Sequence, residues 1–353
     1  MRLLLFNLAT DSADPVLGFT TRWIQALAER VESIQVLTMR AGSLALPANV
    51  RISSVGKEKG YSEPRRVVEF YRHLVRILRT ERIDACFSHM MPIFTVLAAP
   101  VLKACRIPLV TWYAHRRVTT ILKLAHHWSD RMVSINTSSY PCDPRKLVPL
   151  GHGIDTGLFS PGEDGPEEPP FILSVGRLSP VKSQETLIEA IDIVRRRGYA
   201  LRCALVGDAP EHDRAYAQQL RNAVVRRGLN DVVEFVGAVA PQAQVVQWYR
   251  RCFAHVNCGR GAVDKAALEA MACGRASLSS NPGCRETMGR WMEQLSFQPG
   301  NALGLAEKLI AVLHLSPTER EELGGYLRAR TIRMHNLERL TGKLLEVLSE
   351  VQH

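Results

Sequence analysis

The sequence predicts an α/β protein built from two doubly wound parallel sheets. Apolar strand-like runs alternate with segments of helical periodicity along residues 1–160, and the same alternation begins again after residue 170. Residues 160–170 between the two series are rich in Pro, Gly and Glu, which is the composition of a linker. We therefore expect one domain at residues 1–160 and a second at 161–335. A helix at 336–353 should follow and pack back toward the N-terminal domain.

In the first half, each predicted strand is a short apolar run, and a longer amphipathic run follows most of them. Strands are expected at residues 3–6, 34–37, 50–55, 85–88, 108–112 and 132–135. Helices are expected at residues 20–30, 65–80, 92–105 and 118–129. Helical crossovers between strands make the strands parallel, and this favours a doubly wound sheet.

The second half repeats the pattern and ends on a helix. Strands are expected at residues 171–175, 201–206, 232–236, 255–256, 276–278 and 295–297, and the amphipathic run at 336–351 has no strand after it. In open parallel sheets, ligands bind at the carboxyl ends of the strands. The residues that follow each strand, and the space between the domains, are therefore where a site is expected.

The composition excludes several classes of protein. With 46% hydrophobic and 23% charged residues, the chain of 353 residues has the make-up of an ordinary globular protein. It has no apolar run of membrane-spanning length, and its N-terminus lacks the pattern of a signal peptide, so we expect a cytoplasmic protein. The eight cysteines are scattered without a Cys-x-x-Cys pair, which argues against a zinc site and for reduced thiols.

The positive charge lies almost entirely in the first half. Residues 1–160 hold 21 Lys and Arg against 12 Asp and Glu, a net charge of +9, whereas the remainder has a net charge of +1. Such an imbalance favours an anionic partner, namely a membrane surface or a phospholipid-linked acceptor. A basic but unoccupied surface is an equal alternative. Nucleic acid is not expected, because no base-stacking motif accompanies the charge.

Two helical segments concentrate these cations among apolar residues. Residues 65–82 carry six arginines interleaved with Phe, Tyr, Leu and Val, and residues 116–128 carry Arg, Lys and His beside Ile, Leu and Trp. The simpler interpretation is two packed helices with solvated basic faces. The alternative is peripheral docking on an anionic membrane.

A candidate anion site follows the first strand of the second half. Gly176 ends that strand, and the loop after it carries Arg177 and Lys182 before a helix begins near residue 183. Cations at a strand-to-helix turn suit a diphosphate, because the helix N-terminus adds unpaired amides and the positive end of a dipole. Two solvated surface cations are the alternative interpretation.

A second block places one carboxylate in an apolar helix. Glu269 lies within residues 266–274, where its neighbours are Ala, Leu and Met. A carboxylate that accepts two hydroxyl protons suits a ribose, whereas an isolated helical Glu more often faces water. Together, the two blocks indicate a site for a nucleotide diphosphate, and in particular a nucleotide sugar.

These blocks and three others resemble the motifs of family 4 (group 1) glycosyltransferases of the GT-B fold. The similar segments are Val175-Gly-Arg-Leu-Ser-Pro-Val-Lys182, Leu205-Val-Gly-Asp-Ala-Pro-Glu211, Phe235-Val-Gly237, Leu268-Glu-Ala-Met-Ala-Cys-Gly274 and the run from Val148 to Pro161. The resemblance is strong over residues 148–287 and thin before them. It implies two Rossmann-like domains that face each other across a cleft.

The resemblance also implies a reaction and its residues. Arg177 and Lys182 would bind the donor diphosphate and stabilise the departing nucleotide, and Glu269 would bind the ribose. Gly176, Gly207, Glu211 and Gly237 would line the nucleotide. The implied activity is a retaining, metal-independent transfer from a nucleotide-diphosphate sugar to a hydroxyl of a glycan or lipid-linked acceptor, in glycan, glycolipid or cell-surface polysaccharide biosynthesis. No Asp-x-Asp metal motif is present, and no cofactor is expected besides the sugar donor as co-substrate.

The sequence departs from the family pattern where the donor sugar would bind. Gly261 stands where the family has a Glu that contacts the sugar. Asp264, three residues later, is both a plausible helix N-cap and a substitute carboxylate. Lys265 could add a phosphate or sugar contact, and the backbone amides of Ala262, Val263 and Asp264 could address sugar or phosphate oxygens.

Candidates in the first half are fewer. His115 follows the strand at 108–112 and matches the family's histidine near the donor sugar, although a lone His is more often structural. His89, which closes the strand at 85–88, is a weaker candidate for the acceptor cleft. Gly18 is what remains of a family double glycine, and Arg116 completes the acceptor-side set.

Two other functions compete with glycosyl transfer. With Gly261 in place of the Glu, the chain could bind nucleotide sugars without transferring them. A nucleotide-sugar epimerase of the same two-domain architecture is a third possibility, which the order of the motifs disfavours. Peripheral association with the inner face of a membrane would be compatible with each.

Overall fold

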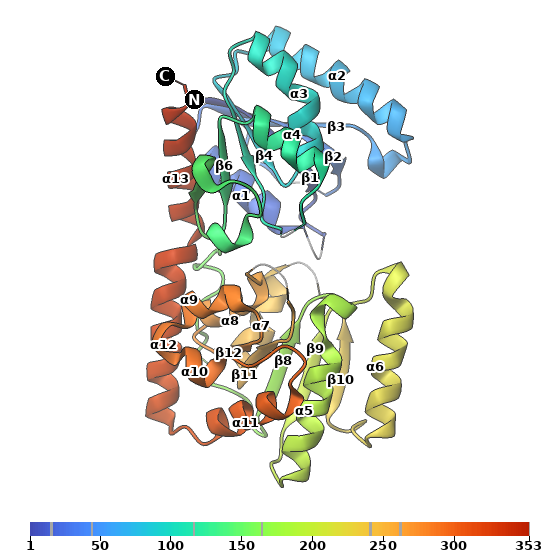
Figure 1. The fold of residues 1–353 in the computed structure, drawn as a ribbon, viewed down its shortest axis with the longest axis vertical. Coiled ribbons are helices and arrows are strands. Elements are labelled where there is room, and N and C mark those ends of the chain that lie inside the picture. The colour runs from blue at the N-terminus through green and yellow to red at the C-terminus, as the bar shows by residue number, and fades with distance from the viewer. Residues whose placement is uncertain are drawn as a thin grey trace. The chain divides into compact units, whose positions relative to one another are not determined.

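The computed structural model describes residues 1–14, 17–43, 45–115, 117–163, 165–239, 242–260 and 263–352. The chain divides into two compact units, which Figure 1 shows. Unit 1 comprises Met1–Gly153 and Leu337–His353, and unit 2 comprises Ile154–Asn336. Each unit is built on its own parallel sheet. No described helix is long and apolar enough to span a membrane.

The sheet of unit 1 has the strand order β3-β2-β1-β4-β5-β6-β7, and every neighbouring pair is parallel. Its strands are β1 (Arg2–Thr10), β2 (Ser33–Ala41), β3 (Val50–Ser54), β4 (Ala85–His89), β5 (Leu109–Trp112), β6 (Arg131–Ser134) and β7 (Leu147–Pro149). The six strands expected from the sequence are present. The edge strand β7 was not predicted, because it is three residues long and contains a proline.

Helices cover both faces of this sheet. They are α1 (Phe19–Ala28), α2 (Glu63–Thr80), α3 (Pro92–Ala104), α4 (Thr120–Trp128) and α13 (Leu337–Glu350), with short 3₁₀ turns η1 (Lys57–Lys59), η2 (Thr137–Ser139) and η3 (Pro144–Lys146). Successive residues of a strand point to opposite faces. Accordingly, Phe6 of β1 packs with α2 and α3, whereas Leu5 lines a small cavity with Trp23 of α1.

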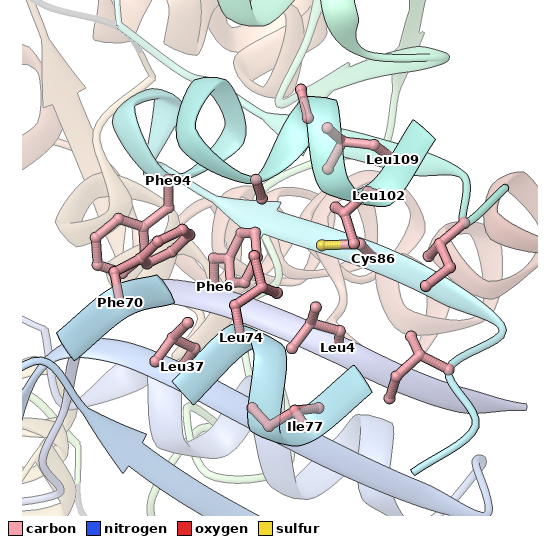
Figure 2. Close-up of a cluster of buried hydrophobic side chains, with 14 of the residues drawn as sticks. Leu4, Phe6, Leu37, Phe70, Leu74, Ile77, Cys86, Phe94, Leu102 and Leu109 are labelled. Carbon is pink, nitrogen blue, oxygen red and sulfur yellow. The ribbon is translucent and has the colours of Figure 1, made fainter. Parts of the chain in front are cut away.

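In the core between the sheet and α2 and α3, the rings of Phe6, Phe70 and Phe94 lie together among aliphatic side chains, as Figure 2 shows. The ring centroids of Phe70 and Phe94 lie 4.7 Å apart, and the ring of Phe6 lies 5.7 Å from Phe70 and 5.8 Å from Phe94. These tilted and edge-on contacts are the arrangements that aromatic quadrupoles favour. The amphipathic pattern of α2 is therefore explained in part by this core, into which Leu74 and Ile77 also point.

The C-terminal helix α13 belongs to unit 1, as the sequence predicted. It contacts α1 and β4, and its apolar stripe is buried. The buried residues of that stripe are Leu337, Leu340, Leu344, Val347 and Leu348. Their spacing of three and four residues keeps them on one face of the helix.

The sheet of unit 2 has the order β10-β9-β8-β11-β12, again with parallel pairs throughout. Its strands are β8 (Phe171–Val175), β9 (Arg202–Val206), β10 (Val233–Gly237), β11 (Ala254–Asn257) and β12 (Ala276–Ser279). The longer helices are α5 (Gln184–Arg196), α6 (Arg214–Arg226), α7 (Gln242–Arg251), α8 (Lys265–Ala272), α11 (Ala302–Leu313) and α12 (Pro317–His335). The shorter ones are η4 (Pro180–Lys182), η5 (Glu211–Asp213), η6 (Pro282–Cys284), α9 (Arg285–Met288), η7 (Gly289–Trp291) and α10 (Met292–Leu295).

The strand predicted at residues 295–297 is wrong. Leu295 ends α10, and Ser296 makes only an isolated bridge to Ser279. Leu295 and Phe297 are buried without a ladder of backbone hydrogen bonds. A run this short carries a signal of burial that does not distinguish a strand from a helix end.

The direction of winding reverses beside β8. From β8 the chain proceeds outward through β9 to β10, and it then returns to the other side of β8 as β11 and β12. Parallel open sheets have a crevice at such a reversal, outside the carboxyl ends of the two central strands. In unit 2 these are the ends of β8 and β11.

Candidate functional site

Three glycines line the carboxyl ends of neighbouring strands in unit 2. Gly176, Gly207 and Gly237 follow or end β8, β9 and β10, and their φ angles are +147°, +135° and +83°. The Gly176 amide donates to Val206 O at 2.9 Å, and the Gly207 amide donates to Gly237 O at 2.7 Å. Glycine adopts these backbone angles readily. We call Gly176, Gly207 and Gly237 the glycine floor. Their backbone carries no side chains, so a ligand can approach it closely.

The loop after β8 presents one cation to solvent. Arg177 is exposed, and its carbonyl oxygen accepts a hydrogen bond from Gln184 Nε2 at 2.8 Å. Its guanidinium makes no hydrogen bond or ion pair with any residue that the structure describes. Leu178 beside it is buried and anchors the loop. An exposed guanidinium on an anchored loop is well suited to capture an anion.

The second cation, Lys182, lies against the glycine floor. Lys182 ends η4, and its side chain passes beside Gly176 and Gly259, where a β-carbon added to either glycine would contact it. Its Nζ forms an ion pair with Asp264 Oδ2, and Lys182 exposes 24% of its side-chain surface. Lys182 therefore crosses from the end of β8 to the segment that follows β11.

Asp264 receives hydrogen bonds on both of its carboxylate oxygens. It is the N-cap of α8, where Oδ1 accepts from the Ala266 amide at 3.1 Å. Oδ2 accepts from Lys182 and from Asn257 Nδ2, the latter at 2.7 Å. Burial alone would raise the pKa of Asp264, but Lys182 and these hydrogen bonds outweigh it and lower the pKa to about 2. The cap expected from the sequence is present, and the carboxylate stays ionised at neutral pH.

Glu269 is buried in the helix that Asp264 caps. The residue is 5% exposed, its Oε1 accepts from Lys265 Nζ at 2.9 Å, and its Oε2 accepts from Tyr249 OH at 3.0 Å. Burial, followed by the neighbouring Glu269 carboxylate, raises the pKa of Tyr249 well above its usual range. The alternative of a water-facing Glu does not fit this burial. Its assignment to a ribose stays a prediction.

Sequence reasoning missed two residues of this network. Asn257 is the last residue of β11, and its Oδ1 also accepts from the Gly259 amide at 3.3 Å. Its position at a carboxyl strand end was an available signal. Tyr249 lies on α7, and nothing in the local sequence pattern connects it with Glu269.

The remaining donor-side candidates are less informative. Glu211 opens η5 and is exposed, and Val263 is buried. Gly261 and Ala262 lie outside the described residues. Among the described residues, no three His, Cys, Asp or Glu side chains gather as they would around a metal ion. The expected independence of metals stays a prediction.

The first-half candidates belong to unit 1. His115 is exposed after β5, and its Nδ1 accepts from the Arg117 amide at 3.0 Å. His89 ends β4 and is buried among aromatic rings, with the Trp23 centroid 4.8 Å away; burial lowers its pKa to about 3. This environment favours a neutral packing residue. Gly18 precedes α1, and Arg116 lies outside the described residues.

Comparison with known proteins bears on the same region. Residues 169–314 match the family model of group 1 glycosyl transferases. D-inositol 3-phosphate glycosyltransferases are similar in sequence: that of Kribbella flavida is 29% identical over 52% of this chain and 46% of its own length. That of Thermomonospora curvata is 28% identical over 59% of this chain and 52% of its own. The chain spans about half the length of these curated relatives.

Solved structures resemble nearly the whole chain. HepE of Anabaena, in complex with UDP, has a TM-score of 0.78 at 16% identity, covering 99% of this chain and 100% of its own. Sucrose-phosphate synthase of Thermosynechococcus elongatus has a TM-score of 0.80 at 17% identity, covering 99% and 98%. These likenesses show the fold, and the expectation of two Rossmann-like GT-B units is confirmed.

Alanine should destabilise the chain more at Gly207, which belongs to the glycine floor, than at Gly228, which also has a positive φ. A β-carbon on Gly207 would overlap the Gly176 carbonyl, whereas one on Gly228, whose φ is +63°, would meet open space. We expect Gly228→Ala to cost about 1 kcal/mol of unfolding free energy. Gly207→Ala should cost at least about 3 kcal/mol, because it adds an overlap with backbone. Urea unfolding measures both, and equal losses would contradict the close approach.

Proposed function

We propose that this chain transfers a sugar from a nucleotide-diphosphate sugar to a hydroxyl acceptor, because residues 169–314 match the family model of group 1 glycosyl transferases. The observation that carries the proposal is the placement of Arg177 and Lys182 beside the glycine floor, at the reversal of the unit 2 sheet. An anion of two phosphates fits two cations and exposed backbone at such a position.

The chemistry follows from where charge develops. When the bond between sugar and phosphate breaks, negative charge grows on the departing nucleotide diphosphate. Fixed cations stabilise that charge most where they are already in place, and removal of one such group typically costs about 3 kcal/mol. Arg177 and Lys182 can serve this role without a metal ion. We propose a metal-independent reaction, and we carry retention of the anomeric configuration from the family resemblance.

The similar proteins indicate which sugar donors and acceptors to test first. HepE of Anabaena was solved with UDP, with UDP-glucose, and with UDP and glucose. UDP-sugars are therefore the first donors to test. The relatives named D-inositol 3-phosphate glycosyltransferases act on a phosphorylated acceptor by name, and the basic first half would suit an anionic acceptor.

A protein that binds nucleotide sugars without transfer is the alternative. It is motivated by Gly261, which replaces the family's sugar-contacting Glu and lies outside the described residues. Both functions need the nucleotide half of the site, to which we assign Arg177, Lys182 and Glu269. Release of free nucleotide separates the two.

Arg177→Ala tests the proposed function most cleanly. Since Arg177 is exposed and pairs with no described residue, its loss should leave folding unchanged and lower the kcat/KM of nucleotide release by about 100-fold. Lys182→Ala is a poorer test, because it also strips Asp264 of its counterion. The assay measures UDP or other free nucleotide released from a panel of nucleotide sugars, with D-inositol 3-phosphate among the acceptors.

The matched control is Arg226→Ala, an exposed arginine in the last turn of α6. It should retain full activity. Full activity in Arg177→Ala would overturn the site assignment. Donor binding by the wild-type chain without release of nucleotide from any donor would favour the non-catalytic alternative.

We further propose that unit 1 docks on an anionic membrane. The exposed face of α2 carries Val67, Val68, Tyr71 and Val75 among arginines. Beside α3, the α4 segment exposes Val118, Ile121 and Leu124 together with Lys123. Exposed apolar side chains beside cations suit the interfacial region of a bilayer, whereas a merely solvated basic face does not need them.

Vesicle binding tests this surface. We expect co-sedimentation with vesicles of one part phosphatidylglycerol to two parts phosphatidylcholine, weakening as salt rises. The double variant Arg65→Ala, Arg79→Ala should bind about 30-fold more weakly, since each of the two surface cations contributes about 1 kcal/mol. Arg226→Ala should bind as the wild type does. Binding that is indifferent to phosphatidylglycerol and to salt would end the proposal.

A further inference from the structure

The ion pair between Lys182 and Asp264 spans the reversal of the unit 2 sheet. Lys182 follows β8, and Asp264 follows β11, the strand on the other side of the reversal. The side chain of Asp264 is 12% exposed. A fixed negative charge thus lies where the proposed function places a ligand that is itself an anion.

The carboxylate is held firmly in that position. Lys182, Asn257 Nδ2 and the Ala266 amide all donate to it, and its place as the N-cap of α8 sets the backbone around it. An N-cap carboxylate is also favoured by the dipole of the helix. Asp264 therefore does not move away easily when a second anion reaches Lys182.

Arg177 and Lys182 therefore differ in how much of their positive charge is available to an anion. Arg177 pairs with no described residue, so its full charge is available to an incoming anion. The charge of Lys182 is already balanced by Asp264. A diphosphate that contacts Lys182 must share the ammonium group with Asp264 and must tolerate a carboxylate close by. Like charges at short range oppose each other.

We propose that Asp264 is a built-in counterion that competes with the donor diphosphate for Lys182. The proposal rests on the proposed function, and it assigns Asp264 a regulatory role in that site. Asp264 keeps Lys182 in place while the site is empty. After transfer, it lowers the affinity of the site for the nucleoside diphosphate. Its effect is to shorten the lifetime of the bound product.

Pyrophosphate binding to neutral Asp264 variants tests the competition. Asp264→Ser and Asp264→Asn both remove the charge and keep a side chain that can cap α8. We expect each to bind inorganic pyrophosphate about tenfold more tightly than the wild type in titration calorimetry at low salt. Asp192→Asn is the matched control, because Asp192 is a paired carboxylate of α5 with 13% of its side chain exposed. It should bind pyrophosphate as the wild type does.

A double variant tests whether the higher affinity for pyrophosphate depends on Lys182. In Lys182→Met, Asp264→Ser, the ammonium group for which Asp264 competes is absent. This variant should bind pyrophosphate no more tightly than the wild type. A tenfold gain that persists without Lys182 would overturn the competition, and so would unchanged or weaker binding in both single variants.

The outcome is separable from that of the proposed function. Tighter pyrophosphate binding in the Asp264 variants, with no nucleotide released by the wild type from any sugar donor, would support the counterion and refute transfer. Nucleotide release by the wild type, with no gain in pyrophosphate affinity in the variants, would support transfer and refute the counterion. If both proposals hold, stopped-flow displacement of UDP should show a slower dissociation from Asp264→Ser than from the wild type.

Discussion

The close approach of three strand ends is the constraint on which the rest of unit 2 depends. Gly207 lies so near the Gly176 carbonyl that no β-carbon fits between them, and Gly237 continues the same edge of the sheet. The absence of side chains there leaves backbone exposed to a ligand. It also lets the side chain of Lys182 lie across Gly176 and reach Asp264 on the far side of the reversal. The glycines at these strand ends therefore keep the backbone open beside Lys182.

Much of this arrangement could be predicted from the sequence, because its signals are local. Hydrophobic periodicity located eleven of the twelve strands in the two sheets to within a few residues. It failed at residues 295–297, where no strand forms, and at β7, and each of these segments is only three residues long. Glycines at strand ends, followed by Arg177 and Lys182, mark an anion site because each feature lies within a few residues of the next. Asp264 could be recognised as an N-cap for the same reason.

The pairings could not be predicted, because they join residues far apart in the chain. Lys182 and Asp264 are 82 positions apart, and Tyr249 and Glu269 come from different helices. Periodicity gives the face on which a residue lies but not its partner across a sheet. For Asp264, the sequence left a cap and a sugar ligand as equal alternatives. The structure adds a third relation, an ion pair with a cation of the same candidate site.

The most direct test of this account is a crystal structure of the chain with UDP or another nucleoside diphosphate bound. Phosphate oxygens should lie within hydrogen-bonding distance of the Arg177 guanidinium and of Lys182 Nζ, above the Gly176 backbone. The separation between Lys182 Nζ and Asp264 Oδ2 should be longer than in the ligand-free chain. A diphosphate bound away from Arg177 and Lys182, with their surroundings unchanged, would contradict it.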